Sequence, residues 1–488
     1  MAETTATSAA RWSIVQGAGG IVLQFATLAV LGRLLSPAVF GAMAILFVVH
    51  KIAMLFAQMG LASSLIQRKD LSRAAQDSLY WLSVALGAVV SVVVILIAPL
   101  VAAAFSLPEL TPTTRVVGLT FVVSAFAVQY QALAQRELRM RRMALINLSS
   151  LVATAVVAIG LALNGFGLWA LVAGLFAATL VRSAAYLVTG IRDHGLPSVH
   201  FSWQEARPLV AFGAHRFGAM LANAVNTHVD QFLVGLMLGA QPLGFYSVAN
   251  RIVRQPVDLI NPVVTRVAFP WLSRLQDDDK RLVDSYLRII ALVTTVNAPL
   301  MVAAAVVAPW LVPLLLGPGW EPAVILVQIL AAYSLVRSVI GAGGSLLLAK
   351  GRADWTFYWN LVLLLVYPAT LFFAARSGSI TVLAGTLTLV QCLVLLVYHR
   401  FLVRPLTGIS LARFLSAVAR PAAVAALAGG IAYAALGALG ITGNLGNIVA
   451  GTLVGGAAYL ALARLLIPRE FAEITRIFIG KISASSAR

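Results

Sequence analysis

The sequence predicts an all-α integral membrane protein with about fourteen spanning helices and both termini in the cytoplasm. Of the 488 residues, 60% are apolar and only 11% are charged, whereas about 25% of the residues of a soluble globular domain are charged. The apolar residues form runs that are long enough for spanning helices, and they lack the alternating pattern of an outer-membrane barrel. Loops rich in Lys and Arg alternate with loops that are poor in them.

Apolar segments of spanning length follow one another along almost the whole chain. They cover residues 13–34, 39–62, 79–105, 115–135, 143–164, 167–190, 209–237, 243–268, 286–316, 321–349, 355–375, 380–403, 414–437 and 445–467. No loop between them is long enough for a folded domain. The eighth segment is the least regular, because it carries charged residues together with Pro256 and Pro262.

The basic residues of the loops predict the orientation of the chain. They follow every even-numbered segment, as Arg68, Lys69 and Arg73; Arg136, Arg139, Arg141 and Arg142; Arg192 and Arg207; Arg274, Lys280 and Arg281; Lys350 and Arg352; Arg400, Arg404 and Arg413; and Arg469, Arg476 and Lys481. Because Lys and Arg accumulate in cytoplasmic loops, these connections and both termini are predicted to be cytoplasmic. The main exceptions are Arg33, Arg115 and Arg376.

Composition also narrows the classes of partner. The net charge of +18 is explained by these loops and by anionic lipid headgroups, so we expect no nucleic acid. The single cysteine, Cys392, excludes a disulfide within the chain, and we expect no metal or other cofactor. The first apolar run is too long for a signal-peptide core, and we expect it to be retained as the first helix.

Three charged residues lie inside the eighth segment, where a spanning helix is normally uncharged. Arg251, Arg254 and Asp258 are spaced by three and four residues, so they share one helix face. A charge near the bilayer centre costs at least about 2.5–3.5 kcal/mol, and such residues usually face a polar pathway. The basic balance of this face predicts that an anionic group binds there or passes by it.

An internal repeat relates the two halves of the chain. The loop after the first segment runs from Gly32 to Gly41, and the loop after the seventh runs from Gly235 to Gly244. Both pairs of glycines are offset by 203 residues, since 235 − 32 and 244 − 41 are equal. This offset spans six helices, and an even number of helices preserves orientation. The halves are therefore predicted to be related by a pseudo-twofold axis along the membrane normal.

The same offset relates Lys51, in the second segment, to Arg254 in the eighth. We therefore predict a cationic central cavity to which both halves contribute. The alternatives are coincidence and a lipid-facing lysine whose amine reaches the interface. Lys51 is predicted to lie about a dozen residues from either end of its helix, which makes that reach long.

Further polar residues are candidates for the same pathway. Arg216 and Arg337 are predicted cavity cations, in the seventh and tenth segments. Asp230 and Asp258 have two interpretations, which the sequence leaves open. They could couple transport to protons or sodium ions, or they could compensate the charge of nearby arginines.

The chain resembles the oligosaccharide flippases, the polysaccharide transporter family of the superfamily that also holds multidrug extruders and the lipid II flippase. The resemblance rests on Gly32 to Gly41, its repeat at Gly235 to Gly244, the stretch from Tyr246 to Arg251 and the stretch from Gln58 to Gln67. No single motif is specific to the family. The ordered set of motifs is specific, and the resemblance covers nearly the whole chain.

The resemblance implies two six-helix lobes, residues 1–207 and 208–404, followed by helices thirteen and fourteen and a cytoplasmic tail in residues 405–488. It implies that the lobes rock to give alternating access, and that the protein is a transporter rather than an enzyme. The cargo would be an undecaprenyl-diphosphate-linked oligosaccharide, moved across the bacterial inner membrane for exopolysaccharide, capsule or O-antigen assembly. Membrane lipids, a polymerase and export machinery would be its partners.

Three other functions are alternatives to this one. A lipid II flippase would also have a cationic cavity, and the sequence separates it least well. An extruder of cationic drugs predicts a cavity dominated by acids. A membrane glycosyltransferase predicts catalytic carboxylates in a sizeable external loop, where we find only Glu109 and Glu321.

Overall fold

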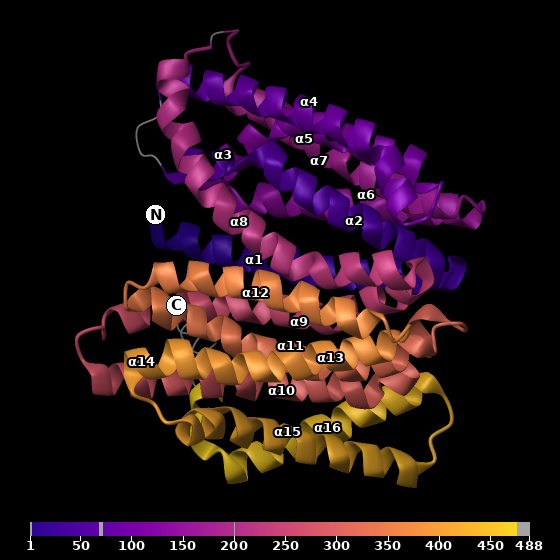
Figure 1. Cartoon of the computed structure of the whole chain (residues 1–488), viewed down its shortest axis with the longest axis vertical. Coiled ribbons are helices and arrows are strands. Elements are labelled where there is room, and N and C mark those ends of the chain that lie inside the picture. The colour runs from indigo at the N-terminus through magenta and orange to yellow at the C-terminus, as the bar shows by residue number, and fades with distance from the viewer. Residues whose placement is uncertain (1, 68–71, 200, 476–488) are drawn as a thin grey trace. The chain divides into compact units, whose positions relative to one another are not determined.

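The computed structural model describes residues 2–67, 72–199 and 201–475, and within these ranges the chain forms helices and turns without strands (Figure 1). Each of the fourteen predicted segments lies on a long helix. These helices are α1 (Ala2–Leu34), α2 (Pro37–Gln58), α4 (Arg73–Ala104), α5 (Leu110–Arg136), α6 (Met140–Leu163), α7 (Leu168–His194), α8 (Trp203–Leu238), α9 (Ala240–Ser273), α10 (Asp279–Leu316), α11 (Pro322–Ala349), α12 (Ala353–Ala375), α13 (Ile380–Tyr398), α15 (Leu411–Leu439) and α16 (Asn444–Leu466).

Twelve helices of the described chain are long and apolar enough to cross a membrane. Helices α8 and α9 are not among them, although they are 36 and 34 residues long. Both carry charged residues within their length, such as Asp230 and Arg254. Membrane crossing by α8 and α9, and the cytoplasmic position of the termini, therefore stay predictions.

In two predicted segments, 39–62 and 380–403, the regular α-helix stops before the predicted end. Helix α2 stops at Gln58, because Met59 and Gly60 take left-handed φ angles of 37° and 70°, and a short helix, α3 (Leu61–Gln67), follows. Helix α13 stops at Tyr398 and continues as a π-helical turn, His399–Val403, and a short helix, α14 (Arg404–Thr407). The amide hydrogen-bonding pattern thus changes where hydropathy alone shows one continuous run.

The chain divides into two compact units, Met1–Gly244 and Phe245–Arg488. Helix α8 belongs to the first unit, where it packs against α2, α3 and α4. The predicted lobe boundaries after residues 207 and 404 follow a repeat of six helices rather than compactness, and they stay predictions.

Small residues bring the helices of the first unit close together. Helices α4 and α5, α6 and α7, and α5 and α7 pack along their lengths (Figure 1). At Gly87 of α4, an added Cβ would lie 2.9 Å from the carbonyl oxygen of Phe121 in α5. At Gly190 of α7, it would overlap the ring of Tyr130. Glycine at such contacts permits the close backbone approach on which helix association in membranes depends.

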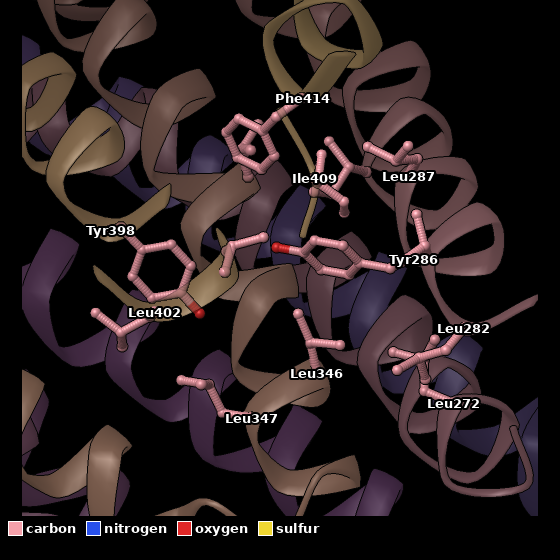
Figure 2. Packing of buried hydrophobic residues seen from close by; sticks show 14 of the residues in the cluster. Leu272, Leu282, Tyr286, Leu287, Leu346, Leu347, Tyr398, Leu402, Ile409 and Phe414 are labelled. Carbon is pink, nitrogen blue, oxygen red and sulfur yellow. The ribbon is translucent and has the colours of Figure 1, made fainter. Parts of the chain in front are cut away.

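The second unit is built around α10, which packs against α11, α15 and α16. An apolar cluster at one end of this unit joins α10, α11, α13 and the start of α15, and Figure 2 shows Tyr286 and Tyr398 among its leucines. A hydrogen bond also joins α16 to α10: the hydroxyl of Tyr459 donates to the carbonyl oxygen of Thr295 at 2.6 Å.

A reciprocal contact joins the two repeated loops within the first unit. A Cβ on Gly41 would overlap the carbonyl oxygen of Ala240, and a Cβ on Gly244 would overlap that of Pro37. Adding 203 to 37 and 41 gives 240 and 244, so each loop uses the same two positions to contact the other. The start of α2 and the start of α9 therefore meet backbone to backbone.

We expect Gly41→Ala and Gly244→Ala each to destabilise the protein by about 1–3 kcal/mol, because the new methyl group forces the two backbones apart. Thermal melting of the detergent-purified chain measures the change. Gly160→Ala in α6 is the matched control, since an added Cβ there meets no atom within 4 Å and alanine is the better helix former. Wild-type melting of both loop variants would contradict the reciprocal contact.

Candidate functional site

Lys51 lies on α2 at a depth set by the start of that helix. Ser36, in an extended conformation, precedes the helix and Pro37 opens it, a position where proline loses no helical hydrogen bond. Lys51 follows Pro37 by fourteen positions, or about 21 Å along the axis. Its side chain is exposed and forms no ion pair with any described residue.

The predicted distance from Lys51 to the far end of its helix was wrong. The left-handed turn at Met59 and Gly60 ends α2 at Gln58, only seven positions after Lys51. Gly60 packs tightly here: an added Cβ would lie 2.7 Å from the carbonyl oxygen of Gly213 in α8. Hydropathy could not show this end, because the apolar run continues into α3.

His50, beside Lys51, fixes the rotation of α2 about its axis. Its buried ring stacks on Phe121 of α5 with centroids 5.1 Å apart. Its Nδ1 lies 3.4 Å from the hydroxyl oxygen of Thr120. Successive residues of a helix are about 100° apart, so Lys51 points away from the contact between α2 and α5.

Arg251, Arg254 and Asp258 all lie on α9. Arg251 and Asp258 are exposed and Arg254 is half-buried. Arg254 follows Ala240, the first residue of α9, by fourteen positions, as Lys51 follows Pro37. Among the described side chains, neither Arg254 nor Asp258 takes part in an ion pair, although they are four residues apart.

The other predicted site residues lie in different surroundings. Asp230 is buried in α8, where its Oδ1 accepts a hydrogen bond from the backbone N–H of Gln231 at 2.8 Å. Arg337, in α11, donates to the hydroxyl of Tyr333 at 2.9 Å, one turn earlier on the same helix. Arg216 falls within α8, but its side chain lies outside the described part of the structure.

Arg182 is a further cation inside a predicted span, and the predicted site did not include it. Arg182 follows Leu168, the first residue of α7, by fourteen positions. It is half-buried and forms no ion pair within the described chain. It lies within electrostatic range of His50. A charge in the middle of the segment 167–190 was the available signal, by the same rule that identified Arg251 and Arg254.

The unpaired cations inside the helices contrast with the basic residues near helix ends. Arg139 contacts Asp193 at 2.6 Å, and Arg142 contacts the same carboxylate. Lys350 contacts Asp279 at 2.7 Å, and Arg413 contacts Asp284 at 2.6 Å. Acidic partners are therefore placed at the ends predicted to be cytoplasmic.

The carboxylate of Glu321, in a predicted external loop, is hydrogen-bonded to the backbone. One of its carboxylate oxygens accepts a hydrogen bond from the N–H of Gly319 at 3.0 Å, just before α11. Hydrogen bonds from its own N–H and that of Gly319 hold the pKa of Glu321 below its usual value. A general acid at neutral pH needs the opposite shift, so this geometry does not favour a catalytic carboxylate.

Comparison with known sequences extends along most of the chain. A sequence model of the family described as "Polysaccharide biosynthesis protein" matches residues 30–325. The lipopolysaccharide biosynthesis protein WzxC of Escherichia coli strain K12 is 31% identical over 412 residues, covering 84% of this chain and 83% of that protein. The succinoglycan biosynthesis transport protein ExoT of Rhizobium meliloti strain 1021 is 26% identical over 395 residues, covering 81% and 79%.

Solved structures show the same fold at low identity. The lipid II flippase MurJ, in an inward closed conformation, matches with a TM-score of 0.73 and 13% identity, covering 97% of this chain and 100% of that one. An inward-facing multidrug transporter of the MATE family matches with a TM-score of 0.60 and 15% identity, covering 80% and 95%. The chain is thus a multi-pass protein of the bacterial inner membrane with a transporter fold. By the extent of these matches, it belongs to the polysaccharide biosynthesis protein family.

Proposed function

We propose that the protein is a flippase that moves an undecaprenyl-diphosphate-linked oligosaccharide from the cytoplasmic to the periplasmic leaflet. The oligosaccharide would be the repeat unit of an exopolysaccharide, a capsule or an O-antigen. Relatives named for polysaccharide biosynthesis and transport support this assignment, as does the transporter fold. The protein would act by transport rather than by catalysis.

The observation that carries the proposal is the pair of unpaired cations at equivalent positions. Lys51 and Arg254 are separated by the repeat offset of 203, and each follows the first residue of its helix by fourteen positions. The reciprocal contact of Gly41 and Gly244 supports the same register. A diphosphate would supply the anionic partner that these two cations lack. Charge-assisted hydrogen bonds to phosphate are among the stronger polar interactions.

The remaining site residues are assigned by the same reasoning. Arg251, Arg216 and Arg337 would contribute further positive charge to a cationic cavity, which the two lobes would expose alternately to the two sides of the membrane. Asp258 is exposed and unpaired with Arg254, which favours proton or sodium coupling over compensation of that arginine. Asp230 is the second candidate for coupling.

Two related functions are outcomes of the same tests. A lipid II flippase would share both the fold and the cations, and would differ in the saccharide. A cation extruder would need acids in place of the bases at positions 51, 251 and 254.

Deletion of the gene should cause an unpolymerised, lipid-linked repeat unit to accumulate, because the cargo would remain in the cytoplasmic leaflet. Extraction of the lipids, followed by mass spectrometry, measures the accumulation and identifies the sugar. Accumulated lipid II would assign the alternative flippase. Normal surface polymer with no accumulated intermediate would exclude the flippase proposal.

Lys51→Ala and Arg254→Ala should each reduce polymer export about tenfold or more, since each removes a charged donor worth about 1.5–3 kcal/mol. Lys51→Arg and Arg254→Lys should retain part of the activity. Export is measured as surface polymer per amount of the protein in the membrane. Arg420→Ala is the control, an exposed arginine of α15. Export at the wild-type level by both alanine variants would show that the paired cations do not carry the cargo.

A further inference from the structure

We propose that Arg182 and Lys51 form an anion-binding site within the first unit, for an anionic group of the cargo. This inference rests on the proposed function and adds a residue and a place of binding to it. The site would be built from α2 and α7, which pack against each other and against α5 (Figure 1).

The first argument is depth. Lys51 and Arg182 each follow the first residue of their helix by fourteen positions. Three predicted spans lie between the two helices, so both run in the same direction and enter from the predicted periplasmic side. At a rise of 1.5 Å per residue, both side chains lie about 21 Å from that side. A single ligand group can therefore meet both at one level of the membrane.

The second argument is proximity through His50. The imidazole is fixed between α2 and α5 by its stacking on Phe121 and its contact with Thr120. Arg182 of α7 lies within electrostatic range of that ring, and Lys51 is its chain neighbour. Because α2 also packs against α7, the two cations lie on neighbouring helices of the unit.

The third argument is the lack of partners. Neither cation forms an ion pair among the described residues, although basic residues near the helix ends do so. One turn after Arg182 on the same face, Tyr186 is 1% exposed and its hydroxyl has no hydrogen-bond partner. A buried hydroxyl without a partner costs free energy, and a bound anion would accept hydrogen bonds from this hydroxyl and from the guanidinium.

A lipid-facing arginine that reaches the interface does not explain these features. Arg182 lies twelve positions before His194, the last residue of α7, or about 18 Å along the axis. That distance exceeds the length of its side chain, and the residue is half-buried rather than exposed. An anionic ligand accounts for the depth, the burial and the unpaired donors together.

The anionic group could belong to the diphosphate or to an acidic sugar of the cargo, and binding to the purified full-length protein separates the two. The probes are undecaprenyl diphosphate without sugar, and a free oligosaccharide that contains a uronic acid. Arg182→Gln should weaken binding of at least one probe about tenfold or more. Loss for the first probe assigns the diphosphate, and loss for the second assigns the acidic sugar.

Matched variants distinguish binding from folding. Arg182→Lys should restore much of the affinity, and Tyr186→Phe should weaken the same probe to a smaller extent. Arg420→Gln, on α15, should bind both probes as the wild type does. The melting temperature of each variant is measured beside its affinity. A variant that melts like the wild type but binds more weakly has lost affinity and not structure.

Two outcomes would overturn the inference, and they have different meanings. If Arg182→Gln binds both probes with wild-type affinity, the site is wrong and the proposed flippase stands. If the wild-type protein binds neither probe, the proposed function fails and the site fails with it.

Discussion

Every backbone N–H and C=O group inside the hydrocarbon layer must find its partner within the protein, and this constraint shapes the whole chain. A helix satisfies these groups within one segment, which is why the fourteen long apolar segments of the sequence all form helices. Helices in lipid gain little from burying apolar surface against each other, so their association depends on close packing. Gly87 and Gly190 show how this is achieved in the first unit, where the missing Cβ leaves room for a neighbouring helix.

The same close packing gives the repeat a structural meaning. Gly41 approaches Ala240 and Gly244 approaches Pro37, so the two repeated loops contact each other through equivalent positions. Neither glycine can gain a side chain without moving the backbone opposite, which ties the start of α2 to the start of α9.

Charge distribution separates the ends of the helices from their interiors. At the ends, Arg139 and Lys350 have carboxylate partners at hydrogen-bonding distance. In the interiors, Lys51, Arg182 and Arg254 have none among the described residues. Water compensates a charge at a helix end, whereas a charge deep in a spanning helix needs a ligand or a polar pathway. An anionic cargo of the proposed kind would therefore contribute most at these interior cations.

The sequence by itself determined the helical class, the positions of the long helices, the repeat offset and the charged face of α9. Each of these is a property of residues that are near in the chain or separated by a fixed number. Tertiary structure alone decided that α8 packs with the first unit, that α2 packs against α7, and that Arg254 and Asp258 form no ion pair within the described chain. These facts depend on how each helix is rotated about its axis and on which neighbour it meets. Hydropathy shows that a segment is helical and how deep a residue lies in it, but the direction of a side chain is fixed only when helices pack.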